Sequence, residues 1–179
     1  MHTPPTDEQL AIVAEQLGRT PRGVLAIAYT TPDNQPAVVK TAPKLDDGTP
    51  FPTLYYLTDP RLCAEASRQE SAGVMKTMTA RLAEDAELAA AYRRAHESYL
   101  AERDAIESLG TDFSGGGMPD RVKCLHVVIA HALAKPLLPR ARPWGRRFPS
   151  AHAASSSALT GRSTCPACPS PPCSAWSVG

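Results

Sequence analysis

Apolar side chains recur at helical spacing near the start of the chain. Leu10, Val13 and Leu17 lie three or four positions apart, which places them on one helix face. Thr6 and Gln9 have the spacing of a capping box, in which each side chain satisfies an open backbone N–H group of the first turn. The residue after Leu17 is a glycine, which suits a C-terminal cap. This pattern predicts a first helix that ends there.

Three short runs rich in apolar, β-branched or aromatic residues follow. They are Val24–Tyr29, Ala37–Thr41 and Thr53–Thr58. The segments between them contain turn-forming residues and are too short for helical crossovers. The pattern therefore predicts a small antiparallel sheet of about three strands.

Helical periodicity returns after Pro60. The predicted segments are Leu62–Ala72, Val74–Leu82, Ala86–Leu109 and Asp120–Ala134. The last is apolar on nearly all its faces, so we expect it at the centre of the core. The predicted class is α+β, with about three antiparallel strands packed with four to five helices.

The last 44 residues differ in composition from the rest. Pro, Ser and Ala supply 23 of the residues in 136–179, which show no apolar periodicity. Such a segment is predicted to stay disordered. We therefore expect an N-terminal helix in residues 1–19, an α+β domain in 20–135 and a disordered tail in 136–179.

The tail also contains no acidic residue, which suggests a hypothesis about its origin. A frameshift in a GC-rich gene would replace a natural C-terminus with sequence of this kind. If neither alternative reading frame beyond codon 135 encodes an acidic, patterned sequence, the hypothesis is wrong.

Charge is divided unevenly between the two parts. Five of the 19 Lys and Arg residues and none of the 18 Asp and Glu residues lie in the tail, so residues 1–135 carry a net charge of −4. An acidic body argues against sequence-independent nucleic-acid binding, and no nucleic-acid partner is expected.

The sequence also bears on location. No apolar stretch approaches the roughly 20 residues of a membrane span, and MHTPPTDEQL lacks the pattern of a secretion signal. A cytoplasmic protein with free thiols is expected, and the Cys165-Pro-Ala-Cys168 pair with Cys173 in the tail is interpreted as accidental.

Three phrases resemble a known bacterial family. They are TAPKLDDGTPFPTLYYLTDPRL (Thr41–Leu62), SRQESAGVMKTMTARL (Ser67–Leu82) and GGMPDRVKCLHVVIAHALA (Gly116–Ala134). Together they resemble the family known as domain of unknown function 501, over about residues 20–135. The resemblance implies a cytoplasmic bacterial protein often encoded near enolase, a septum-formation initiator and an exopolyphosphatase, and it supplies no activity or cofactor.

The chain departs from that family at three places. Members usually carry cysteines near Ala26–Thr30 and at Asp59, and they continue differently after the last helix. A metal site built on those cysteines would therefore be incomplete here, and the altered end adds to the suspicion of a frameshift.

One candidate site would bind an anion. The loop residues Gly115, Gly116 and Gly117 lead toward the last predicted helix, where Arg121 and Lys123 occupy the first turns. Open N–H groups and the helix dipole favour phosphate or carboxylate at such a point. Arg61 and Arg68, near the start of another helix, would add bidentate contacts if they folded nearby. The alternative is a flexible glycine linker with solvated cations.

A second candidate site involves metal or thiol chemistry. Cys124, His126 and His131 all fall within the last predicted helix, where residues seven apart share a face and residues two apart do not. Cys124 and His131 are therefore the weak metal candidates, and a buried thiol and a core histidine are the favoured interpretation.

Two classes of function stay open. In one, the protein binds, or acts on, an anionic or phosphorylated small molecule, with His126 as the acid or base. In the other, it is a protein-interaction module, linked to cell division or polyphosphate metabolism by gene neighbourhood. Convergence of the cations on one pocket would favour the first.

Overall fold

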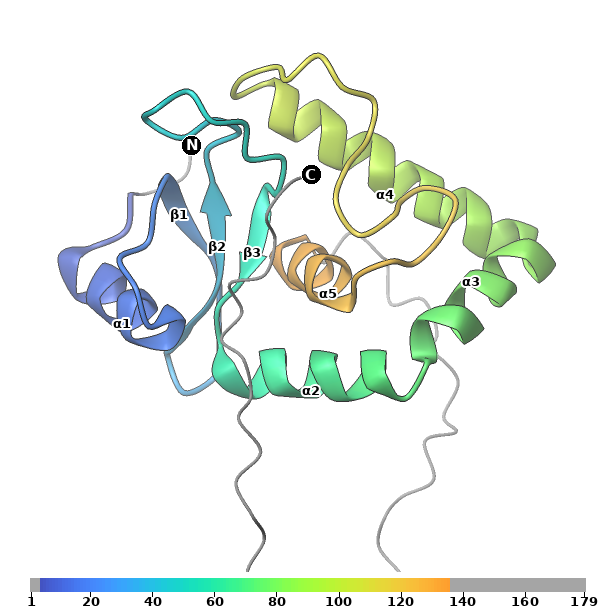
Figure 1. Cartoon of the computed structure of the whole chain (residues 1–179), viewed down its shortest axis with the longest axis horizontal. Helices are drawn as coiled ribbons and strands as arrows, with labels where there is room; N and C mark the ends of the chain where they lie inside the picture. The colour runs from blue at the N-terminus through green and yellow to red at the C-terminus, as the bar shows by residue number, and fades with distance from the viewer. Residues whose placement is uncertain (1–3, 136–179) are drawn as a thin grey trace, which may run out of the picture. The chain divides into compact units, whose positions relative to one another are not determined.

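The structure is a computed structural model that describes residues 4–135, shown in Figure 1. Its elements in chain order are α1 (Asp7–Leu17), β1 (Val24–Thr30), β2 (Pro36–Thr41), β3 (Tyr55–Leu57), α2 (Pro60–Ser71), α3 (Val74–Glu84), α4 (Ala86–Asp104) and α5 (Leu125–Ala134). The predicted α+β class is confirmed. The predicted tail lies outside the described residues and stays a prediction.

The three strands form one antiparallel sheet in the order β1-β2-β3. All six positions of β2 are buried, because helices cover both faces of the sheet. Figure 1 shows α1 on one side and α5 on the other. The side chain of Gln16 on α1 donates a hydrogen bond to the Pro36 carbonyl at the start of β2 (2.8 Å).

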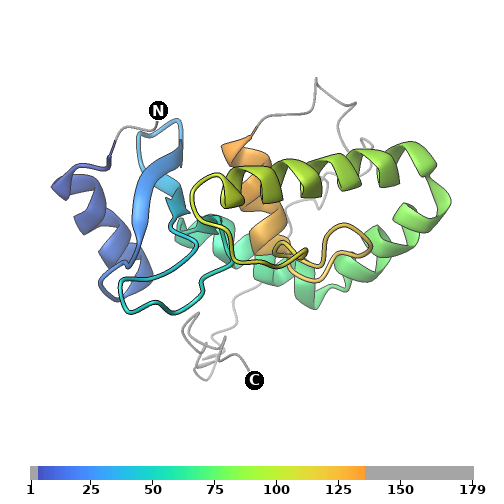
Figure 2. The same cartoon turned by 90° about the horizontal axis from the view of Figure 1, so that it is seen from above.

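Helix α5 lies at the centre of the molecule, as expected. It packs against β3 and α2, and its His131 ring meets the Tyr99 ring of α4 edge-on at 5.2 Å. Figure 2 shows α4 crossing over α5. The core around α5 is formed by the buried residues Val38, Leu54, Tyr55, Leu57, Ala66, Tyr99, Met118, Val122, Leu125 and Ala130.

Two predicted helix boundaries were wrong. Helix α5 begins at Leu125 and not at Asp120, because the N–H groups of Lys123 and Cys124 donate to the Gly116 carbonyl and hold the chain in a turn. Helix α4 ends at Asp104 and not at Leu109. The chain turns back after Asp104 because the Arg103 side chain donates hydrogen bonds to two backbone carbonyls of the following loop.

Among the described residues, no helix is long and apolar enough to cross a membrane.

Candidate functional site

The glycine loop packs tightly against the start of α5. The Gly116 carbonyl accepts from the N–H groups of Lys123 (2.6 Å) and Cys124 (3.3 Å). Gly117 has a φ of +87°, and a Cβ there would lie 2.9 Å from the Arg121 carbonyl oxygen. The loop is therefore a close-packed turn and not the flexible linker of the alternative interpretation.

The start of α5 already holds an anion from the protein itself. The Glu70 carboxylate, at the end of α2, accepts the Leu125 N–H at 2.7 Å. It thereby caps a helix end whose own N-cap residue, Cys124, makes no side-chain capping bond. A phosphate at this N–H group would have to displace Glu70, so the predicted mode of anion binding at the helix terminus does not fit the structure.

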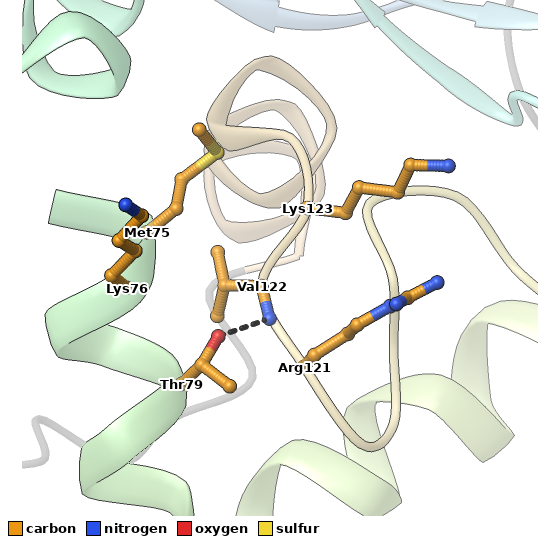
Figure 3. Close-up of a pocket in the computed structure, with 6 residues that line it drawn as sticks. All are labelled: Met75, Lys76, Thr79, Arg121, Val122 and Lys123. Atoms are coloured by element: carbon orange, nitrogen blue, oxygen red, sulfur yellow. Dashed lines mark hydrogen bonds between the residues drawn. The ribbon is translucent and has the colours of Figure 1, made fainter. Parts of the chain in front are cut away.

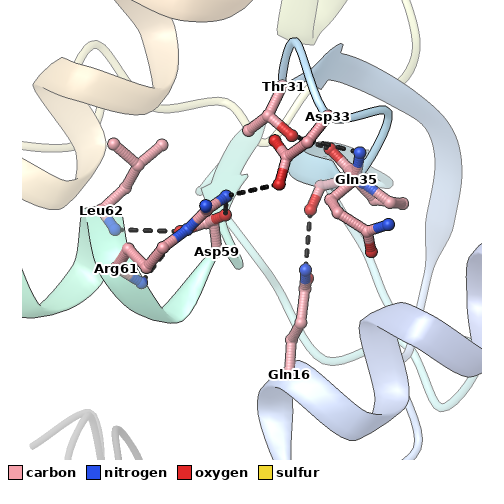
Figure 4. A network of polar contacts seen from close by, with 8 residues as sticks. Gln16, Thr31, Asp33, Gln35, Asp59, Arg61 and Leu62 are labelled. Carbon is pink, nitrogen blue, oxygen red and sulfur yellow. Dashed lines mark hydrogen bonds and ion pairs between the residues drawn. The ribbon is translucent and has the colours of Figure 1, made fainter.

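Arg61 and Arg68 do not join the glycine loop. Arg61 contacts the carboxylates of Asp59 (2.9 Å) and Asp33 (3.4 Å), as Figure 4 shows. Its hydrogen bond with Asp59 lowers the pKa of that carboxyl, and the reciprocal contact raises the pKa of Arg61. Arg68 pairs with Glu65 on the same helix (2.5 Å). Both arginines are therefore neutralised by carboxylates on or near α2.

The other two predicted cations do come together, in a groove between α3 and the segment before α5. We call it the basic groove. It has a volume of about 460 Å³ and is lined by Met75, Lys76, Thr79, Arg121, Val122 and Lys123. In Figure 3, α3 forms one wall, and Arg121 and Lys123 extend from the other wall with their charged ends directed away from α3.

One hydrogen bond joins the two walls of the basic groove. The Thr79 hydroxyl on α3 accepts the Val122 N–H at 3.0 Å. This contact ties the loop to α3 and so fixes the positions of the neighbouring Arg121 and Lys123. The site differs from the predicted one because Lys76 takes the place of Arg61 and Arg68.

The structure places His131 and Cys124 in different surroundings. The His131 ring stacks on Tyr55 (5.7 Å between centroids), and burial lowers its pKa. Cys124 instead faces His126, with 4.0 Å between Sγ and Nδ1. The predicted helix geometry does not apply to this pair, because Cys124 precedes α5 in an extended conformation.

His126 also meets Glu70, with 3.2 Å between Nδ1 and Oε1. Its contact with Cys124 raises the pKa of His126, burial acts to lower it, and the Glu70 carboxylate raises it further, to about 9. A histidine of this kind is mostly protonated near neutral pH, which does not suit the general base that the sequence suggested.

Sequence reasoning missed Glu70 and Lys76. Both lie on polar positions of amphipathic helices, where charged residues are ordinary. Their roles depend on contacts with residues about 45 to 55 positions further along the chain. No local pattern marks such contacts.

The fold and the groove define a small α+β domain with a basic groove beside the start of its central helix. Residues 27–148 match the family described as Protein of unknown function (DUF501), and the chain belongs to this family. The resemblance found in the sequence is thus confirmed, and the match also includes residues 136–148. No curated protein and no solved structure gives a significant match to the chain.

Proposed function

We propose that the protein binds a phosphorylated or otherwise anionic small molecule in the basic groove. One observation carries the proposal: Lys76, Arg121 and Lys123, from two separate segments, line the same hollow. Within residues 4–135, Lys76 and Arg121 take part in no ion pair.

The charge distribution of the domain supports this proposal. Residues 1–135 are net acidic, and most arginines and lysines of the described part contact a carboxylate. Lys76 and Arg121 take part in no ion pair within the described residues, and such positive charges attract anions.

The lining also indicates what kind of anion fits. The side chains of Met75 and Val122 offer apolar surface, and the Thr79 hydroxyl can donate a hydrogen bond. An organic phosphate with a small apolar or sugar portion would use both kinds of contact. The open groove keeps the charges hydrated, so each ion pair contributes only about 0.2–1 kcal/mol, and inorganic phosphate alone should bind with a Kd of about 1 mM or weaker.

The alternative of a protein-interaction module has less support. The large exposed hydrophobic residues of the described part are Leu25, Ile106 and Phe113. They come from β1 and from the loop after α4, and none lines the basic groove. A cytoplasmic location is part of the proposal, supported by the free thiols of Cys63 and Cys124.

Thermal unfolding with inorganic phosphate and pyrophosphate tests the proposal. A ligand that binds the native state raises Tm, and we expect this for both anions at 10 mM or above. Arg121→Glu should abolish the shift. Arg94→Glu, the same charge change at an exposed position on α4, should leave it intact. Equal shifts in both variants, or none in the parent protein, would refute the proposal.

A further inference from the structure

Three potential metal ligands meet beside the start of α5. They are the Glu70 carboxylate, the Cys124 thiol and the His126 imidazole, and one ligand atom from each lies within 4.8 Å of the other two. We propose that these residues form a binding site for a divalent transition metal of the Zn²⁺ class.

The local fold explains why the three side chains converge. Cys124 is the N-cap of α5 and has an extended backbone (φ −147°, ψ 118°), so its side chain can face His126 in the first turn. Glu70 reaches the same point from the end of α2, where the Leu125 N–H fixes one of its oxygens. Two segments that lie 55 residues apart in the sequence thus supply the site.

The separations suit a single ion. Around a tetrahedral Zn²⁺, bonds of about 2.0–2.3 Å place neighbouring ligand atoms about 3.3–3.6 Å apart. The Nδ1 atom of His126 lies 3.2 Å from Glu70 Oε1 and 4.0 Å from Cys124 Sγ. Small side-chain rotations therefore bring all three atoms into coordination distance.

The chemistry of the donors selects among metals. A thiolate and an imidazole favour Zn²⁺ and similar ions over Mg²⁺ and Ca²⁺, which prefer oxygen ligands. The second ring nitrogen of His126, Nε2, lies 3.4 Å from the Ser67 hydroxyl. Metal-bound histidines commonly make such a hydrogen bond through the other nitrogen, which orients the ring.

A capping role for Glu70 alone does not account for this arrangement. A cap requires only the contact with the Leu125 N–H. It gives no reason for a thiol and an imidazole to gather at the same carboxylate. The side chains of His126 and Glu70 are 22% and 24% exposed, so an ion could reach the site from solvent. Three protein ligands leave a fourth position for water or a ligand, as in catalytic zinc sites.

The tail must be controlled in any test, because Cys165, Cys168 and Cys173 can bind zinc themselves. The experiment therefore uses the full chain with these three residues changed to serine, after treatment with a chelator. Isothermal titration with Zn²⁺ should give one site per chain. Titration with Co²⁺ should give thiolate-to-cobalt absorption, which reports directly on a sulfur ligand.

Variants identify the ligands. Cys124→Ser should remove the cobalt–thiolate absorption and weaken Zn²⁺ binding at least tenfold, and His126→Gln should weaken binding by a similar factor. Glu70→Gln should also weaken it, although an amide oxygen can still cap Leu125 and preserve the helix. Cys63→Ser, at the other cysteine of the domain, should bind like the parent.

Absence of a stoichiometric Zn²⁺ site in the parent, or unchanged binding in Cys124→Ser and His126→Gln, would overturn the proposal. Circular dichroism of each variant separates lost ligands from lost folding. Thermal unfolding with phosphate, repeated on chelator-treated protein, keeps this outcome separate from that of the basic groove.

Discussion

Gly110 and Gly117 both have positive φ angles, yet their surroundings differ. A Cβ on Gly110 (φ +64°) would have no neighbour within 4 Å, whereas one on Gly117 (φ +87°) would lie 2.8 Å from Lys123 Cβ and 2.9 Å from the Arg121 carbonyl oxygen. Gly110→Ala should lower the free energy of unfolding by only about 1 kcal/mol, which is the cost of a non-glycine residue at a positive φ. Gly117→Ala should cost at least about 2 kcal/mol more, because backbone atoms must move.

Urea unfolding of the two alanine variants measures this difference. Equal losses would mean that the turn at Gly117 is looser than the structure indicates. Phosphate binding provides a second measurement, since displacement of Arg121 and Lys123 by the new Cβ should weaken binding in Gly117→Ala alone.

Glu102 gives the stability of the domain a specific pH dependence. Partial burial acts to raise its pKa, but hydrogen bonds from Lys40 and Lys135 outweigh burial and lower the pKa to about 2. A carboxylate with a lowered pKa stabilises the folded state above its unfolded value, near 4.5, and loses this contribution as the pH falls toward 2.

Glu102→Gln should therefore lower the free energy of unfolding at pH 7 by about 2 kcal/mol. The difference between parent and variant should shrink as the pH falls from 4.5 to 2. Urea unfolding at a series of pH values checks both points. If the free energies of unfolding of the two proteins change in parallel with pH, Glu102 is not the group responsible for the loss of stability between pH 4.5 and 2.

Residue types suggested the chemistry of the candidate sites, but not which residues meet. The sequence identified Arg121 and Lys123, which do line one groove. It paired Cys124 with His131, whereas the structure pairs Cys124 with His126. The reason is physical: helix periodicity governs neighbours only inside a helix, and Cys124 lies just outside one.

At the level of elements, helix boundaries marked by local capping residues were predicted correctly, whereas the start of α5 and the end of α4 were not. The predicted capping box of Thr6 and Gln9 is present, and Asp85 caps α4 by accepting the Leu88 N–H. These capping signals act within one helical turn and can be recognised in the sequence. The end of α4 depends instead on Arg103, whose fully buried side chain donates to the carbonyls of Thr111 (2.8 Å) and Phe113 (2.7 Å).

Arg103 should accordingly hold the loop between α4 and the glycines. Arg103→Leu removes both hydrogen bonds and leaves the two carbonyls without this donor, at a cost on the order of 3 kcal/mol. Hydrogen exchange at residues 105–117 should accelerate more than exchange in the sheet. Arg94→Leu, on the exposed side of the same helix, is the matched control. Uniform acceleration in Arg103→Leu would indicate global destabilisation instead of loop release.

For the whole molecule, periodicity sufficed for the fold class, and tertiary contacts decided the sites. Short runs of apolar, β-branched and aromatic residues predicted the three strands, and a helical segment that is apolar on nearly all its faces predicted the central last helix. The contacts of Glu70 with Leu125 and His126 arise only when α2 packs against α5. Such contacts have no local sequence signal, which is why the candidate metal site could not be predicted.

The C-terminal end of the domain can be located by truncation. The family match ends at residue 148, whereas residues 149–179 lie beyond it and show no apolar periodicity. A chain ending at 148 should therefore unfold at the same urea concentration, and with the same slope, as the full chain.

A chain ending at 135 retains Lys135, which pairs with Glu102, but loses the last thirteen residues of the match. We expect it to unfold at a lower urea concentration, because α5 is apolar on most of its faces and needs covering. If the two truncated chains and the full chain have the same midpoint, the family-matched residues after 135 contribute nothing to the fold of this protein.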